Sequence, residues 1–227
     1  MVKYTDILKI GLSNFMNLIE VKQLKIPGVK VIKFGRFADE RGYFSETLRK
    51  SDIEKNKELD FIKDVDFVQF NESYSKAGVL KGLHFQWQPL LGKLLRTVSG
   101  HMVDMILDIR KNSPTKGKII MYDMPSNPEL SYGEWLWLPP GIAHGSFFLE
   151  DSILEYFFSA DYNQNGEAGI SPLSQDMYWT LCDPFLKEKF DKFQNENLLI
   201  NSNDKKGLSL TEWFQDNRSE KFTYNLT

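Results

Sequence analysis

Short apolar segments separated by turn residues follow one another from about Gly28 to Tyr162. They are rich in Val, Ile, Phe and Leu, they are divided by Gly, Pro and Asn, and they read VKVIKF, FVQFNES, LLRTVSG, HMVDMILDI, KIIMYDM, EWLWLPP and ILEYFFSADY. Closely spaced strands with little helix between them are typical of antiparallel barrels and sandwiches. The central part of the chain is therefore predicted to be mainly β.

Helical patterns flank this central part. Apolar residues recur at helical spacing over residues 6–20, behind Thr5 or Asp6 as an N-cap. Asp183 followed by Pro184 predicts a helix to about Phe193, and Ser209 with Glu212 predicts a capping box for a last short helix. We expect a helical extension over residues 1–24, a β-barrel domain over 25–180, and a helical segment over 181–227 that packs on the barrel.

Composition limits the classes of partner. Hydrophobic residues make up 41% of the 227 residues, which is enough for a large core. A net charge of −3 gives no general attraction to nucleic acid or membranes, so bound anions would need local lysines and arginines. The lone Cys182 excludes an internal disulfide, and residues 1–20 resemble neither a signal peptide nor a membrane span. We expect a cytoplasmic protein.

Two of the three histidines, His84 and His144, lie beside glycine turns in strand-like segments. Asp104 and Asp108 are an even number of residues apart, so both face one side of a strand whose other side is apolar. A carboxylate inside a barrel is costly unless it is paired or binds a ligand, and an aspartate bonded to an imidazole fixes its tautomer. The alternative for His84 is a structural histidine held by polar neighbours.

Cations and metal ligands give weaker signals. Lys93 and Arg96 at the start of a strand are either an ordinary solvated edge or fixed cations that stabilise an oxyanion or phosphate. A metal site is not favoured, because Phe85 and Gln86 follow His84 where a His-x-His pair would be needed, and His101 is the remaining candidate.

Several motifs occur in the order found in one family. They are FADERGYFSET (37–47), FVQFNES (67–73), GVLKGLHFQ (78–86), GKLLR (92–96), MVDMILDIRKNSPTKGK (102–118) and LPPGIAHG (138–145). The chain resembles the dTDP-4-dehydrorhamnose 3,5-epimerase family of nucleotide-sugar epimerases from about Ile32 to Leu210. The resemblance implies a cupin-like double-stranded β-helix, a homodimer, and catalysis without metal or organic cofactor.

The resemblance also implies a reaction. A base removes an acidic proton beside the C4 ketone of a sugar, and a proton returns from the opposite face. His84 matches the base, Asp104 matches a supporting aspartate, and Lys93 matches the lysine that stabilises the enolate. Asp204 matches a second supporting aspartate, although it could simply be a turn residue in NDKKG.

Other residues match positions that bind the nucleotide diphosphate: Arg41, Glu46, Gln69, Asn71, His144 and Glu167. Lys81 stands where the family has arginine, so it keeps the charge without bidentate geometry. Phe37 and Tyr162 match aromatic positions that stack on the base. In the family an N-terminal segment crosses to the partner subunit, which implies that Arg41 and Glu46 complete the neighbour's site.

The chain departs from the family at the proton donor. Counting thirteen residues from His144 to the family tyrosine reaches Phe157, and the adjacent Tyr156 is expected on the other face of the strand. Phe157 would thus occupy a substrate-binding position, where it cannot donate a proton. Three hypotheses follow: epimerisation of one carbon only, donation by water or another group, or a nucleotide-sugar-binding cupin without activity. We expect Phe157→Tyr to raise the rate or widen the product range, and no change in either would mean that another group donates the proton. Asn203 also replaces a usual lysine.

Overall fold

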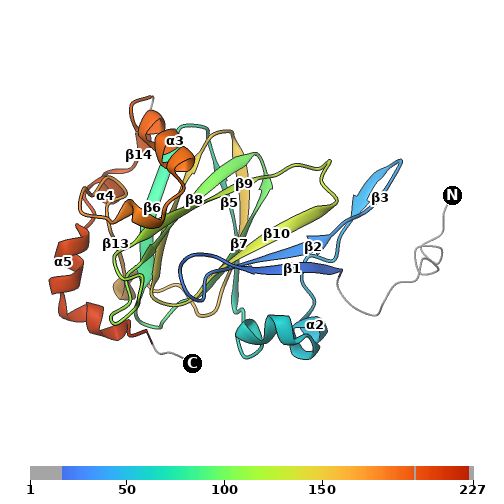
Figure 1. Cartoon of the computed structure of the whole chain (residues 1–227), viewed down its shortest axis with the longest axis horizontal. Coiled ribbons are helices and arrows are strands. Elements are labelled where there is room, and N and C mark those ends of the chain that lie inside the picture. The colour runs from blue at the N-terminus through green and yellow to red at the C-terminus, as the bar shows by residue number, and fades with distance from the viewer. Residues whose placement is uncertain (1–16, 197, 225–227) are drawn as a thin grey trace.

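The computed structural model describes residues 17–196 and 198–224, which form two facing β-sheets (Figure 1). The six-stranded sheet has, in spatial order, β1 (Leu18–Gln23), β2 (Lys30–Gly35), β10 (Tyr132–Leu138), β7 (Lys93–Ser99), β12 (Ser152–Phe158) and β5 (Gln69–Ser75). The second sheet has β13 (Glu167–Gly169), β6 (Val79–Gln86), β11 (Ile142–Phe148), β8 (His101–Asp108) and β9 (Ile119–Pro125), with β14 (Leu199–Ile200) parallel to β6. The other strand pairs of these two sheets are antiparallel, so the predicted mainly-β, antiparallel fold is confirmed.

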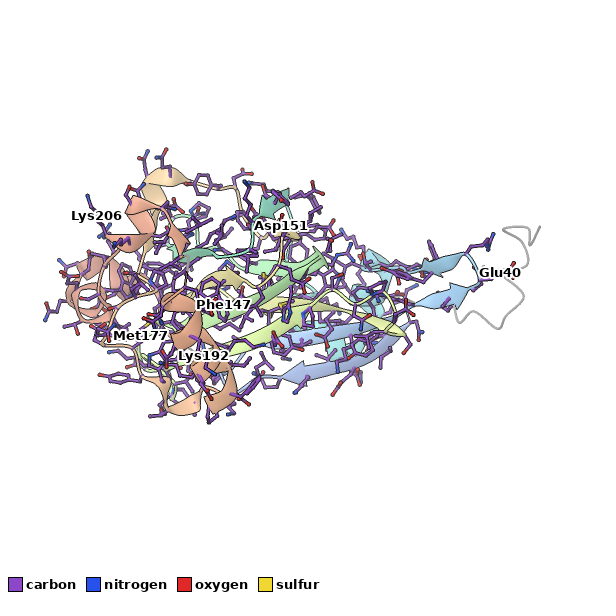
Figure 2. The ribbon with its side chains drawn as sticks, turned by 90° about the horizontal axis from the view of Figure 1, so that it is seen from above. Glu40, Phe147, Asp151, Met177, Lys192 and Lys206 are labelled. Atoms are coloured by element: carbon purple, nitrogen blue, oxygen red, sulfur yellow. The ribbon has the colours of Figure 1, made fainter. Side chains whose placement is uncertain are left out.

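A separate hairpin, β3 (Phe37–Asp39) and β4 (Gly42–Phe44), extends from the sheets at the end opposite to the C-terminal helices (Figure 1). Figure 2 shows Glu40 at the tip of this hairpin. The remaining elements are α2 (Lys50–Lys55), η1 (Lys57–Ile62), η2 (Gln164–Gly166), η3 (Trp179–Leu181), α3 (Pro184–Gln194), α4 (Ser202–Lys205), α5 (Leu210–Gln215) and η4 (Asn217–Lys221). None of the helices in the described part of the chain is long and apolar enough to cross a membrane.

Strand β8 is buried on both faces, and its alternation divides the core in two. Met102 and Ile106 point between the sheets, where they pack with residues of β7 and β10. Val103, Met105 and Leu107 point the other way and pack against the C-terminal helices. The C-terminal segment therefore covers the outer face of the second sheet.

The C-terminal helix signals are confirmed. The Asp183 side chain accepts hydrogen bonds from the backbone N–H groups of Phe185 and Leu186, and Pro184 is the first residue of α3. Ser209 and Glu212 form the predicted capping box at the start of α5.

The helical prediction is wrong at the start of the described chain. Residues 1–16 lie outside the described residues, but Leu18–Gln23 forms strand β1 rather than the end of a helix. A β-bulge between Leu18 and Glu20 interrupts the strand alternation. Leu18 and Val21 therefore pack on the same core although they are three residues apart, which imitates helical spacing.

Asp108 has a structural role. It is fully buried, and its carboxylate accepts hydrogen bonds from Arg110 at 2.8 Å and from Ser113 and Thr115 at 2.5 and 2.6 Å. These donors offset the cost of burying the charge, and they stabilise the loop that follows β8.

Candidate active site

A cavity of about 440 Å³ lies between the two sheets, within the size range of ligand sites. The six-stranded sheet contributes Gln69, Asn71 and Ser73 from β5, Lys93 and Leu95 from β7, and Leu154, Tyr156 and Phe158 from β12. The second sheet contributes Lys81, His84, Phe85 and Gln86 from β6, His144, Gly145, Ser146 and Phe148 from β11, and Glu167 from β13. Most of the polar residues predicted from sequence therefore face one space.

Two glycines bring strands β6 and β11 close together in this cavity. Gly82 has a φ of +103°, and a Cβ on it would lie 2.4 Å from the Cα of Gly145. His84 and His144 are register partners across the two strands, beside a bulge at His144. The two imidazoles are consequently neighbours on the same wall.

His84 forms a hydrogen bond with Asp204 from the C-terminal segment. Its Nε2 lies 2.8 Å from Asp204 Oδ1, and the side chain of His84 is 43% exposed while that of Asp204 is 3% exposed. A buried carboxylate that accepts from Nε2–H leaves Nδ1 with the lone pair, which is the arrangement of a general base.

Asp104 was predicted to support His84, and the structure corrects this pairing. Asp104 Oδ2 lies 3.1 Å from His144 Nδ1 and accepts a hydrogen bond of the same length from Ser146 Oγ. The reason is strand order: β8 pairs with β11, which separates it from β6. Each imidazole on this wall therefore has its own aspartate.

Burial makes His144 a poor proton acceptor. Its pKa is lowered, first by burial and then by the nearby positive charge of Lys93, and the Asp104 contact opposes the shift only in part. A neutral imidazole held by Asp104 suits a ligand-binding role, because it offers a fixed hydrogen-bonding edge.

Lys93 is the first residue of β7, only 8% exposed, and its Nζ donates to the backbone oxygen of His84 at 3.3 Å. Burial lowers its pKa to about 8, against the raising effect of Asp104 and Glu167. The ammonium group is thus fixed next to His84, and a fixed cation of this kind can stabilise a developing oxyanion.

Tyr156, and not Phe157, faces the cavity, so the sequence prediction for Phe157 is corrected. Phe157 packs on the outer side of the sheet, with ring centroids 4.8 Å from Trp135 and 4.7 Å from Phe70. Tyr156 pairs with Leu95, which lines the cavity, whereas Phe157 pairs with the outward-facing Leu94. The count of thirteen residues from His144 is therefore one residue too long for this chain. Because neighbouring residues of a strand point to opposite faces, it selects Phe157 on the outer face instead of Tyr156 on the cavity face.

The other cavity residues form a polar rim. Gln69 donates to Asn71 at 2.9 Å and accepts from the backbone of Tyr162 at 2.8 Å. The Tyr162 hydroxyl donates to Glu167 at 2.6 Å, and this bond raises the pKa of Tyr162 to about 12. Burial lowers the pKa of Lys81.

Arg41 and Glu46 do not line this cavity. Arg41 lies in the turn of the β3–β4 hairpin, where it pairs with Asp39, and Glu46 pairs with Arg49. Phe37 is at the base of the same hairpin. Within one chain the hairpin residues and the cavity are separate.

No group of three His, Cys, Asp or Glu side chains in the described residues is arranged to hold a metal ion. His101, the third histidine, binds Asp123 at 2.6 Å instead.

Two residues near the catalytic candidates were missed by the sequence reasoning. Ser146 binds Asp104, and Asn201 binds Asp204 through its side chain at 2.9 Å. Asn201 carried a usable signal, because an asparagine three residues before an aspartate is a common N-cap arrangement.

Comparisons with known proteins show which family the chain is similar to. The family model described as dTDP-4-dehydrorhamnose 3,5-epimerase matches residues 23–219. The protein of that name from Shigella flexneri is 36% identical over 179 residues, covering 77% of this chain and 92% of the relative. Its counterpart from Sinorhizobium fredii is 38% identical over 152 residues, covering 66% and 73% of the two chains.

Solved structures show the same fold. A dTDP-6-deoxy-D-glucose-3,5-epimerase from Legionella pneumophila, in complex with dTDP-4-keto-L-rhamnose, has a TM-score of 0.74 at 26% identity and covers 92% of this chain and 99% of its own. The dTDP-4-dehydrorhamnose 3,5-epimerase from Sulfolobus tokodaii has a TM-score of 0.68 at 31% identity, with 87% and 97% covered. The chain thus has the predicted cupin-like jelly roll and belongs to the dTDP-4-dehydrorhamnose 3,5-epimerase family of isomerases.

Proposed function

We propose that the protein epimerises both C3 and C5 of a dTDP-4-keto-6-deoxyhexose in deoxysugar biosynthesis. Family membership and the ligand-bound Legionella relative support a nucleotide-sugar substrate. The observation that carries the proposal is that His84 and Tyr156 line one cavity from opposite sheets.

The proposed chemistry uses residues already placed in the cavity. His84, backed by Asp204, takes the proton from the carbon beside the ketone, and the C–H electrons form the enolate. The ammonium group of Lys93 stabilises the negative charge on the C4 oxygen. Tyr156 then returns a proton to the opposite face of the carbon, since it lies on the opposing sheet. Burial raises the pKa of Tyr156, which keeps its phenol in the donor form at neutral pH.

The alternatives raised by Phe157 lose their motivation. Inversion at one carbon only, and binding without turnover, were both suggested by a missing proton donor. With Tyr156 facing the cavity, the donor has a candidate in the expected strand.

The test is solvent exchange with the wild-type protein. A dTDP-4-keto-6-deoxyhexose in D₂O is expected to take up deuterium at both C3 and C5, as seen by NMR against a sample without enzyme. Uptake at one carbon would support the single-carbon alternative. Binding by calorimetry without any uptake would contradict the proposed activity.

Lys93 gives a prediction for the pH dependence. Because its pKa is about 8, the ammonium is present below pH 8 and lost above it, so kcat/KM is expected to fall on the basic side with a midpoint near pH 8. Lys93→Met should lower kcat by about 10²–10³-fold, the usual effect of removing an oxyanion donor. Lys93→Arg keeps the positive charge at high pH, so the fall of kcat/KM on the basic side should move to higher pH. If this fall stays at the same pH in Lys93→Arg, it belongs to the titration of another group.

We further propose a cytoplasmic homodimer in which the β3–β4 hairpin and the residues directly after it bring Arg41 and Glu46 to the partner's cavity. The hairpin projects from the sheets (Figure 2), and the outer face of β5 leaves Phe70 and Tyr74 64% and 58% exposed. Apolar surface of this kind is typical of a subunit interface. Sedimentation velocity at micromolar concentration should show a dimer, and a monomer would contradict the proposed homodimer.

The cytoplasmic location is supported by the lone Cys182. This cysteine is buried and unpaired, which suits a reducing compartment.

A further inference from the structure

We propose that Asn201 is a positioning residue, which holds the Asp204 carboxylate in the orientation that binds His84. This inference rests on the proposed function, in which His84 is the base. Asn201 contacts neither the cavity nor His84 directly, so its effect would pass through Asp204.

Asn201 and Asp204 are joined by two reciprocal hydrogen bonds. Asn201 Nδ2 donates to Asp204 Oδ2 at 2.9 Å, and the backbone N–H of Asp204 donates to Asn201 Oδ1 at 2.8 Å. One amide side chain therefore fixes both the backbone and the carboxylate of the same aspartate.

The two oxygens of Asp204 have separate roles. Oδ1 binds His84, while Oδ2 accepts from Asn201 and, at 3.2 Å, from the backbone N–H of Gly82. The terminal torsion of aspartate is intrinsically broad, so the donors to Oδ2 determine which way Oδ1 points. Of these two donors, only Asn201 can be removed by changing a side chain.

The hydrogen bond from Asn201 to Asp204 matters more because few other local interactions hold the segment around Asp204. Asp204 lies in α4, which is only four residues long and is therefore not stable by itself. The segment reaches the site because β14, just before it, pairs with β6 at Leu199 and Val79. Asn201 itself is exposed, so a substitution there leaves no cavity in the core.

Several charged or titratable groups share the cavity with His84, and all would stay in place. They are Lys81 on β6, Lys93 on β7, His144 on β11, Tyr156 on β12, Tyr162 in the loop after β12 and Glu167 on β13, with Asp104 behind His144. A change at Asn201 that keeps a side-chain acceptor for the Asp204 N–H alters only the donor to Oδ2 of Asp204.

Two variants separate positioning from simple helix capping. Asn201→Ser and Asn201→Asp both keep an N-cap acceptor for the Asp204 N–H, but both remove the amide donor to Oδ2. We expect Asn201→Ser to lower kcat about 10-fold with KM changed less than about 2-fold, because a hydrogen bond to a charged group is lost. Asn201→Asp should lower kcat about 100-fold and move the acid limb of kcat/KM upward by about one pH unit, since added negative charge favours the protonated imidazole.

The matched control is Ser202→Asp, which adds the same charge at the next exposed position of α4. It should leave kcat and the acid limb unchanged, with all three variants melting within a few degrees of wild type. Wild-type kcat and pH profile in both Asn201 variants would overturn the inference. The inference would also be overturned if activity fell only in step with a lowered Tm while the pH profile stayed unchanged. That result would mean that Asn201 acts only as the N-cap of α4.

A measurement without substrate separates this inference from the proposed function. The chain has three histidines, so the ring signals of ¹³C-labelled histidine can be assigned with a His84→Asn variant. The His84 signal of Asn201→Asp should titrate at higher pH than in wild type, whether or not the wild type turns over a 4-keto sugar. Identical titration curves would overturn the positioning role even if epimerisation is established.

Discussion

His84→Asn is expected to abolish deuterium uptake at both C3 and C5 of a dTDP-4-keto-6-deoxyhexose. General-base catalysis contributes about 10²–10⁴-fold, and an asparagine side chain cannot accept the proton. The fold should survive, because the His84 side chain is 43% exposed and asparagine can still donate to Asp204. The measurement is the initial rate of uptake by NMR, with the melting temperature recorded for the same sample.

The control for this substitution is His101→Asn. His101 binds Asp123 and does not line the cavity, so its replacement should leave the rate of uptake unchanged. Retention of the wild-type rate in His84→Asn would remove the imidazole from the mechanism. Loss of uptake in both variants would point to damage of the fold instead.

The features that the sequence predicted well are local. Alternation along β8 places Asp104 and Asp108 on one face and Val103, Met105 and Leu107 on the other, as expected. The caps at Asp183 and Ser209 depend on neighbours within a few residues, and both occur as predicted. Such signals are carried by adjacent residues, so no knowledge of the tertiary fold is needed to use them.

The features that failed depend on non-local arrangement. Whether Asp104 binds His84 or His144 is decided by the order of β6, β11 and β8 in the sheet, which a single sequence does not state. The bulge in β1 similarly shifts Leu18 and Val21 onto one face and imitates a helix. The contact between Asp204 and His84 is also non-local, because 120 residues separate the two. It was expected correctly, but only from the family resemblance.

The error at Phe157 differs, because the sequence held the information to avoid it. In the segment LEYFF, the charged Glu155 marks the outer face of the strand, and Phe157 shares that face by alternation. Leu154, Tyr156 and Phe158 are then the inward set, as the cavity lining has them. A spacing counted across a loop is weaker evidence than the alternation of a strand, because loops tolerate insertions and deletions.

Tyr156→Phe and Phe157→Tyr form a pair that tests this assignment. If Tyr156 returns the proton, Tyr156→Phe should lower the rate of epimerised product by about 10²–10⁴-fold. Deuterium uptake by the sugar should fall less than the rate of epimerised product. His84 can still remove a proton from the carbon and return a deuteron to the same face. The ratio of uptake to inversion is therefore expected to rise, and NMR of one reaction measures both quantities.

Phe157→Tyr should leave both rates unchanged, because its ring lies against Trp135 and Phe70 on the outer side of the sheet. Its hydroxyl would cost at most about 1–3 kcal/mol of stability if it lacked a partner there. This expectation reverses the one from the sequence alone, in which Phe157→Tyr would restore a donor. A rise in the epimerisation rate of Phe157→Tyr, together with normal inversion by Tyr156→Phe, would place the proton donor at position 157 and contradict the inward orientation of Tyr156.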